Sequence, residues 1–319
     1  MLSDAQILVF GMQSIVYASN SFLIPMLSRL HPDWQVLRAW DNIMETTAVT
    51  ALATTVWDPI DKHYLARFPR LEVICHLGLG VDNLDVETIG ARGIQLLSQP
   101  QAGIHDTAEL AMALLLGLTR KISLNDQYVR AGKWLAGKPK QLGHHLLGKR
   151  VGLLGYGQIG QMIGKFLQPF GVEISYCARQ PKSCPFTYVA DLETLARESD
   201  YLIVCCTGGE STRHLVDTNV LAALGEKGYL INVARGSVVD EKALLTALQS
   251  QKIAGAALDV YSSEPGIDPV FYQLDNVVLS PHMGSSTHEN LQAMFALQAA
   301  QLNGYLLEKD KFSCLEATF

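Results

Sequence analysis

The stretch VGLLGYGQIGQMIGKFLQPFGVEISYCARQ, residues 151–180, decides the fold. It begins with an apolar strand, 151–154, which is followed by Gly155, Gly157 and Gly160. An amphipathic helix, 158–170, and a second strand, 172–177, complete the stretch. Glycines at this spacing allow a tight turn, close approach of the backbone to a pyrophosphate, and close packing of helix on strand. The helix N-terminus then faces the anion. Because both strands and the helix are present, the stretch predicts a dinucleotide-binding βαβ unit.

Length, composition and charge exclude several classes of protein. The chain has 319 residues, enough for about two domains. Its 48% hydrophobic and 18% charged residues indicate a globular chain with a sizeable core rather than disorder. The net charge is −6 and the basic residues are scattered, so we expect neither a nucleic-acid partner nor a membrane partner. The longest apolar run, 110–118, is too short to span a bilayer.

The six cysteines predict reduced thiols rather than disulfides or zinc ligands. Most lie in apolar, strand-like stretches, without CxxC spacing or histidine partners. The adjacent His144 and His145 cannot both face one metal from a helix or strand, so we expect surface residues and no metal. The N-terminus also lacks the basic-then-apolar pattern of a secretory signal. Together these features predict a cytoplasmic location.

Apolar runs alternate with helical patterns along the chain, which predicts parallel sheets covered by helices on both faces. Before the glycines the predicted strands are 7–10, 36–37, 48–52, 73–75 and 94–97, and the predicted helices are 22–30, 61–68 and 86–92. After them the predicted strands are 201–206, 229–233, 254–258 and 277–279, and the predicted helices are 192–197, 219–224 and 241–249. The later strands are almost continuously apolar, as is typical of strands buried on both faces.

Two contrasting segments lie between these halves. Residues 103–120 predict a long helix that is almost wholly apolar from Leu110 onward. A helix that is apolar on all sides is buried, so we expect it between two domains. Residues 125–148 are polar and interrupted by glycines and a proline, which predicts an irregular loop.

Ligands of doubly wound sheets bind beyond the carboxyl ends of the strands. There Arg235, Glu264 and His282 follow three successive predicted strands. Each of them alone has an ordinary interpretation, as a loop cation, a solvated acid or a turn histidine. Together, beside a dinucleotide-binding loop, they have the parts needed for hydride transfer to a carbonyl.

These residues lie in longer motifs that resemble a known family. The motifs are INVARGSVVDE (231–241), LDVYSSEP (258–265), SPHMGSST (280–287), HLGLGVDNLD (76–85) and DTAELA (106–111). With the glycines, they make nearly the whole chain similar to the D-isomer-specific 2-hydroxyacid dehydrogenase family, and within it to glyoxylate/hydroxypyruvate reductases. The resemblance implies an α/β fold of two doubly wound parallel-sheet domains. A Rossmann cofactor domain, 100–286, would be inserted in a flavodoxin-like substrate domain made of 1–99 and 287–319.

The resemblance implies the reduction of small 2-oxo acids to D-2-hydroxy acids. Arg235 would bind the substrate carboxylate through its planar fork and polarise the adjacent carbonyl, and His282 would give its proton to the carbonyl oxygen. Glu264 would orient the imidazole and favour its protonated form. From the substrate domain, the backbone N–H groups of Leu79 and Gly80 would bind the carboxylate, so that closure completes the site. Relatives pair through the region of the apolar helix, so we also expect a homodimer.

The resemblance assigns cofactor contacts to the glycines and to other strand ends: Thr107, Gly155, Gly157, Gln158, Ile159, Gly160, Cys206, Thr207, Val233, Ala234, Asp259, His282 and Gly284. NAD-specific folds carry an acid about 20 residues beyond the glycines. This chain instead has Ala178 there, followed by Arg179, with Lys182 in the same turn. A guanidinium can stack on adenine and bind a 2′-phosphate, so we expect NADPH to be preferred over NADH, with NAD possible. The alternative is that both cations are solvated loop residues.

Other functions stay open. Phosphite dehydrogenases share the fold but carry a lysine where this chain has Leu79, which disfavours phosphite. The segment after Cys206, TGGE, departs from the resemblance, because it lacks the proline-containing turn of many relatives. A non-catalytic nucleotide-sensing protein is disfavoured by the intact Arg235, Glu264 and His282. A hydrolase that keeps its nicotinamide bound would need further nucleophile or base motifs, which the sequence lacks. Nothing in the sequence fixes the substrate side chain.

Overall fold

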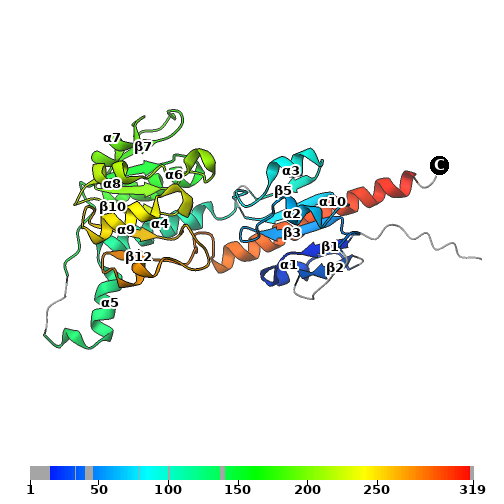
Figure 1. The fold of residues 1–319 in the computed structure, drawn as a ribbon, viewed down its shortest axis with the longest axis horizontal. Helices are drawn as coiled ribbons and strands as arrows, with labels where there is room; N and C mark the ends of the chain where they lie inside the picture. Colours follow the sequence, from blue (N-terminus) through cyan, green and yellow to red (C-terminus); the bar gives the residue numbers. More distant parts are fainter. Residues whose placement is uncertain are drawn as a thin grey trace, which may run out of the picture. The chain divides into compact units, whose positions relative to one another are not determined.

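The computed structural model describes residues 15–32, 34–39, 46–78, 80–99, 101–136 and 141–316. The predicted strand at 7–10 lies outside these residues. The chain divides into two compact units, unit 1 (Met1–Ala102 with His288–Phe319) and unit 2 (Gly103–Thr287). Each is built on one wholly parallel sheet flanked by helices (Figure 1). The predicted fold class is confirmed.

Unit 1 contains a five-stranded sheet in the order β2-β1-β3-β4-β5, the flavodoxin-like order. Its strands are β1 (Ile15–Ala18), β2 (Gln35–Arg38), β3 (Ala51–Thr55), β4 (Val73–Leu77) and β5 (Gln95–Leu97). The sequence analysis did not predict β1. Strand β3 begins and ends three residues later than the predicted 48–52. It extends further because Thr54 and Thr55 also lie in the sheet and are buried.

Helices cover both faces of this sheet. They are α1 (Ile24–Leu27), which follows the 3-10 turn η1 (Ser21–Leu23), then α2 (Lys62–Ala66), α3 (Val86–Ala91) and α10 (His288–Glu316). The prediction of one helix over 22–30 was wrong, because the segment forms only these two short turns. Helix α10 was not predicted. Its Phe295 and Leu302 pack in one core with alternate residues of β3, Ala51 and Ala53, whereas Leu52 faces the core on the α2 and α3 side.

Unit 2 contains a seven-stranded sheet in the order β12-β11-β10-β9-β6-β7-β8. Its strands are β6 (Arg150–Leu154), β7 (Glu173–Cys177), β8 (Thr187–Tyr188), β9 (Tyr201–Val204), β10 (Tyr229–Asn232), β11 (Gly255–Leu258) and β12 (Val277–Leu279). The chain runs outward from β6 through β7 to β8 and then returns to the other side of β6 as β9. The order therefore reverses beside β6, the position at which such sheets bind ligands.

Two layers of helices cover the seven-stranded sheet (Figure 1). The helices are α4 (Ile104–Thr119), α5 (Ile122–Arg130), α6 (Gln158–Leu167), α7 (Leu192–Arg197), α8 (Thr218–Leu224) and α9 (Glu241–Gln249). Short 3-10 turns complete the unit: η3 (Lys133–Ala136), η4 (Gln168–Phe170), η5 (Glu210–Thr212), η6 (Gly236–Val238) and η7 (Pro269–Gln273). Alternate strand residues face opposite layers: Leu230 packs in the core of α7, α8 and α9, and Ile231 in the core of α4 and α6.

The segment between the two sheets differs from its prediction. The predicted loop at 125–148 begins instead inside helix α5 and continues through η3. None of the residues of α5 is buried, and Asp126 pairs with Arg130 one turn later at 2.8 Å. For 125–136 the prediction was wrong, because it gave weight to the polar composition, whereas a solvated helix needs only good local pairing. Residues 141–148 are irregular, as predicted. The apolar character of α4 has an internal cause, since Ala111 and Leu115 are buried in the core of unit 2.

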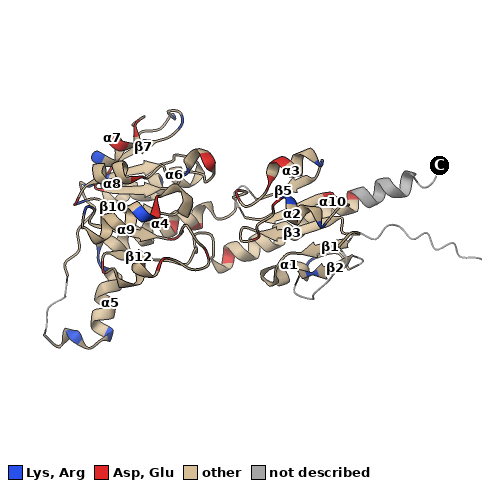
Figure 2. Ribbon diagram, viewed as in Figure 1, with Lys and Arg blue, Asp and Glu red and all other residues tan. Residues whose placement is uncertain are grey.

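Charged residues are distributed over the helices and loops of both units rather than along one element (Figure 2). Within the described residues, no helix combines the length and apolar content that crossing a membrane requires. Five cysteines of the described residues are free thiols, Cys75, Cys177, Cys184, Cys205 and Cys206, and no group of three metal-ligating side chains gathers in that part of the chain. His144 and His145 are exposed, as predicted.

Candidate active site

Two of the three glycines after β6 have close backbone neighbours, and the third faces open space. Gly155 has φ +101°, and a Cβ there would lie 2.6 Å from the backbone of Cys206. A Cβ at Gly160 would lie 2.4 Å from the carbonyl oxygen of Gly155. At Gly157 a Cβ would meet no described atom within 4 Å, because the start of α6 opens onto free space. Packing explains two of the glycines, and the third leaves room for a ligand.

The start of α6 supplies donors toward that space. The first intrahelical hydrogen bond runs from the N–H of Gln161 to the carbonyl of Gly157. The N–H groups of Gln158, Ile159 and Gly160 precede it, and such groups at a helix start bind anions. The residues present therefore fit the pyrophosphate of a dinucleotide.

The strands beside β6 place the other predicted cofactor residues. After β7, Ala178 is half-buried, and Arg179 and Lys182 are exposed. After β9, Thr207 is exposed and Cys206 is half-buried. Burial raises the pKa of the Cys206 thiol to about 11, so this thiol is neutral near neutral pH.

Glu264 and His282 form a close pair in unit 2. Nδ1 of His282 lies 2.6 Å from Oε2 of Glu264, and the backbone N–H of Tyr261 donates to Oε1 at 2.8 Å. Burial raises the pKa of Glu264, but the hydrogen bonds from His282 and Tyr261 and the charges of His282 and Arg235 outweigh it, so the pKa is lowered overall. The carboxylate is ionised near neutral pH and fixes the imidazole through one nitrogen.

The turn that carries His282 is held by Asp259, which is 1% exposed. The carboxylate accepts from Ser280 Oγ at 2.6 Å and from the backbone N–H groups of Met283 at 2.7 Å and Gly284 at 2.9 Å. The carbonyl of Asp259 also accepts from the N–H of His282, whose φ of +55° is in the left-handed region. Asp259 therefore fixes the backbone from which the imidazole projects.

Arg235 begins the turn after β10 and is half-buried. The buried Asn232 fixes this turn, since its Oδ1 accepts from the N–H of Ala234 at 3.0 Å and its Nδ2 donates to the carbonyl of Arg235 at 3.1 Å. A Cβ at Gly236 would lie 1.8 Å from the carbonyl oxygen of Tyr261, so this turn packs directly on the loop of Glu264. Unit 2 thus brings Arg235, Glu264 and His282 together.

The remaining predicted residues have different surroundings. Val233 and Ala234 are buried. Thr107 is buried in the first turn of α4, where a Cβ at Gly284 would lie 3.2 Å from its Oγ1. Leu79 lies outside the described residues. Gly80 follows β4 in unit 1, and its carbonyl lies 2.9 Å from Nε2 of His76.

Three supporting residues were not predicted: Asn232, Tyr261 and Ser280. The Tyr261 hydroxyl donates to the carbonyls of Leu258 at 3.1 Å and Ser280 at 2.9 Å. Burial raises the pKa of Tyr261 to about 12, so the hydroxyl stays protonated as a donor. Asn232 does leave a signal, because it is the one polar residue in the apolar run 229–234 before Arg235.

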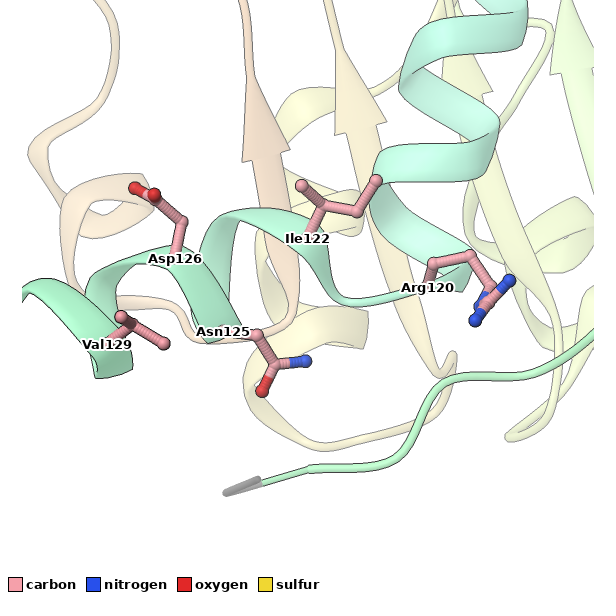
Figure 3. A pocket seen from close by; sticks show the side chains of 5 residues that line it. All are labelled: Arg120, Ile122, Asn125, Asp126 and Val129. Carbon is pink, nitrogen blue, oxygen red and sulfur yellow. The ribbon is translucent and has the colours of Figure 1, made fainter. Parts of the chain in front are cut away.

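A surface hollow lies elsewhere, where α4 ends and α5 begins (Figure 3). Its lining consists of Arg120, Ile122, Asn125, Asp126 and Val129. None of these is a predicted site residue, so the hollow is separate from the strand ends that carry Arg235, Glu264 and His282.

A parallel sheet with a glycine-rich phosphate loop at its switch point, and with an arginine and a histidine–carboxylate pair at neighbouring strand ends, defines a dinucleotide-dependent dehydrogenase. The chain belongs to the D-isomer specific 2-hydroxyacid dehydrogenase family, whose NAD binding domain model matches residues 112–284. The predicted resemblance is confirmed.

Several proteins similar to this chain are named as reductases of 2-oxo acids. A glyoxylate/hydroxypyruvate reductase from Arabidopsis thaliana is 36% identical over 256 residues, covering 80% of this chain and 79% of the relative. A 2-ketogluconate reductase from Gluconobacter oxydans is 38% identical over 283 residues, covering 88% and 89%. Among solved structures, an NADPH-dependent glyoxylate/hydroxypyruvate reductase from Sinorhizobium meliloti, in complex with NADP and malonate, has a TM-score of 0.87 at 35% identity, covering 92% of this chain and 94% of that chain.

Proposed function

We propose that the protein reduces small 2-oxo acids of the glyoxylate/hydroxypyruvate type to D-2-hydroxy acids and prefers NADPH. The observation that carries the proposal is the 2.6 Å pair of His282 and Glu264 with Arg235 beside it. The names of the relatives support the substrate class.

In the proposed reaction each of the three residues has a separate task. Glu264 binds Nδ1 of His282, so the other ring nitrogen, Nε2, is the one that donates a proton to the carbonyl oxygen. Arg235 binds the carboxylate and draws electron density from the adjacent carbonyl. A reduced dinucleotide, with its pyrophosphate bound at Gly155, Gly157 and the start of α6, would supply the hydride. Asp259 and Asn232 keep the two catalytic turns in place.

The substrate carboxylate would also be bound by backbone N–H groups of Leu79 and Gly80. In this proposal residues 100–286 form the cofactor domain, and residues 1–99 and 287–319 form the substrate domain. Closure of the two domains would exclude water and complete the site.

NADPH preference is proposed from the loop after β7. Ala178 leaves no carboxylate to repel a 2′-phosphate, and Arg179 and Lys182 place two exposed cations within a few residues. The Sinorhizobium meliloti relative is described as NADPH-dependent and was solved with NADP, which supports the same choice here.

One assay tests the activity. The purified chain is mixed with NADPH or NADH and with glyoxylate, hydroxypyruvate, pyruvate, phenylpyruvate or 2-ketogluconate, and the loss of reduced-nicotinamide absorbance is followed. We expect turnover with at least one small 2-oxo acid, and a product of D configuration wherever reduction creates a stereocentre. Cofactor binding without turnover would support the nucleotide-sensing alternative, and oxidation of phosphite with NADP would support the phosphite alternative.

We also propose that the chain is a homodimer. The apolar residues of α4 are largely used inside unit 2, whereas Ile122 and Val129 of α5 and Trp134 and Leu135 of η3 are exposed, Leu135 by 98%. A second copy covering this surface would remove these side chains from water. Sedimentation at micromolar concentration should give twice the 34.9 kDa chain mass, and a monomer would refute the proposal.

A further inference from the structure

The loop after β7 is closed by a side chain from the strand that leads into it. Tyr176 in β7 is 1% exposed. Its hydroxyl accepts from the backbone N–H of Lys182 at 2.6 Å and donates to the carbonyl of Lys182 at 3.2 Å. At the other end of the loop, the hydroxyl of Tyr188 in β8 donates to the carbonyl of Ala178 at 3.3 Å. Both ends of the segment 178–182 are therefore fixed by buried or half-buried tyrosines.

The position of the Tyr176 hydroxyl is set by ring packing. Tyr176 stacks on Tyr156 with ring centroids 4.3 Å apart, and it lies 5.5 Å from the ring of Tyr188. Tyr156 is the residue between Gly155 and Gly157 in the glycine loop. One aromatic stack thus connects the loop that fits the pyrophosphate with the loop that carries the two cations.

We propose that Tyr176 is a positioning residue for the selection of NADPH over NADH. The inference rests on the proposed function, because it concerns how Arg179 and Lys182 meet the 2′-phosphate. Both cations are exposed, and ordering long side chains on a ligand costs conformational entropy. A backbone fixed at Lys182 limits that cost, because fewer bonds remain to be ordered when the ligand binds.

Tyr176→Phe tests the inference, because it keeps the stacked ring and removes the hydroxyl that holds Lys182. Dissociation constants for NADPH and NADH are measured by fluorescence titration, and kcat and both KM values are measured with the best 2-oxo acid. We expect NADPH to bind about five- to tenfold more weakly, which corresponds to the loss of a hydrogen-bonded constraint. NADH binding, kcat at saturating NADPH and the KM of the 2-oxo acid should change by less than about twofold.

Two comparisons make the outcome decisive. Tyr201→Phe is the matched control, since Tyr201 is an equally buried tyrosine of the same sheet whose ring stacks on Tyr229, and it should leave the NADPH to NADH ratio unchanged. In a Lys182→Ala background, Tyr176→Phe should lose most of its effect, because the hydroxyl then positions no cation. An equal loss for both cofactors, or no loss for NADPH, would overturn the inference while the reductase activity stands. If the unmutated chain shows no NADPH preference, the cofactor proposal and this inference both fail.

Discussion

The two ends of the carboxyl edge of the unit 2 sheet are built differently. At β10 to β12 the supporting groups are buried and saturated with hydrogen bonds: Asp259 alone binds Ser280, Met283 and Gly284. After β7, the side chains of Arg179 and Lys182 are exposed. There the hydrogen bond from the Lys182 N–H to Tyr176 fixes the backbone of the loop and not its cations. The two ends have different requirements. Proton transfer needs atoms that are in place before the substrate arrives, whereas recognition of a ligand charge can use side chains that become ordered on binding. Mutations at the first end should therefore reduce kcat, and mutations at the second should change cofactor choice.

The largest effect should come from His282→Ala, which removes the proposed proton donor. We expect kcat to fall by at least about 1,000-fold with cofactor affinity nearly unchanged, because the donor contributes chiefly in the transition state. Steady-state kinetics and NADPH titration measure the two quantities separately.

His282 has a positive φ, so alanine at this position also adds backbone strain. His282→Asn removes the donor while tolerating the left-handed region, and it should be equally inactive. His214→Ala is the matched control, since His214 is exposed and has a φ of +53°. Turnover in His282→Asn comparable to the unmutated chain would refute the assignment of the proton donor.

The next largest effect should come from Arg235→Lys. An ammonium keeps the charge but cannot form two parallel hydrogen bonds to a carboxylate, so we expect kcat/KM for the 2-oxo acid to fall about 100-fold. The same exchange at the exposed Arg213 serves as the control. Unchanged kinetics would show that Arg235 is not the carboxylate anchor.

Glu264→Gln should have a smaller effect, because the amide keeps the side-chain length and loses only the charge. We expect kcat to fall about tenfold at neutral pH. The pKa of Glu264 is lowered in the folded chain, so its ionised form stabilises the fold above the ordinary glutamate pKa, and this contribution is lost as the pH falls through the lowered value. Urea unfolding should therefore show the mutant less stable at about pH 7, and the difference should shrink as the pH falls below the ordinary glutamate pKa. A difference that does not change with pH would contradict this account.

The sequence predicted the elements whose signal is local. Helices α7 and α9 have the predicted bounds, because each follows an aspartate that caps it and repeats apolar residues at helical spacing. Strands such as β9 and β10 were recognisable because burial on both faces makes them almost continuously apolar, whereas the two-residue strand β8 was not predicted. Since all strands are parallel, the residues after them meet at one edge, which is why Arg235, Glu264 and His282 could be grouped without a structure.

Features that depend on distant partners could not be predicted. Strand β1 is defined by its neighbours β2 and β3 rather than by its four residues. The buried part of α10 has apolar residues at the spacing needed to pack on the sheet of unit 1, whose strands lie far earlier in the chain. In the sequence, Asp259 is visible only as an acid in a loop. Its hydrogen bonds to the turn after β12 depend on the pairing of β11 with β12, which the sequence does not show.

The most selective effect should come from Arg179→Ala, which should leave kcat unchanged. If the exposed end of the sheet edge reads the 2′-phosphate, removing one guanidinium loses a charged hydrogen bond that NADH never makes. We expect the KM for NADPH to rise at least about tenfold, little change for NADH, and kcat at saturating NADPH unchanged, since the reacting atoms are held at the other end. Arg197→Ala, an exposed arginine at the end of α7, is the matched control. The selectivity should also weaken with added salt, because an exposed charge pair is screened, whereas the defect of His282→Asn should not depend on salt. Equal efficiency with both cofactors in the parent chain, or an equal loss for both in the mutant, would show that this loop does not read the phosphate and that the two ends do not divide the work as proposed.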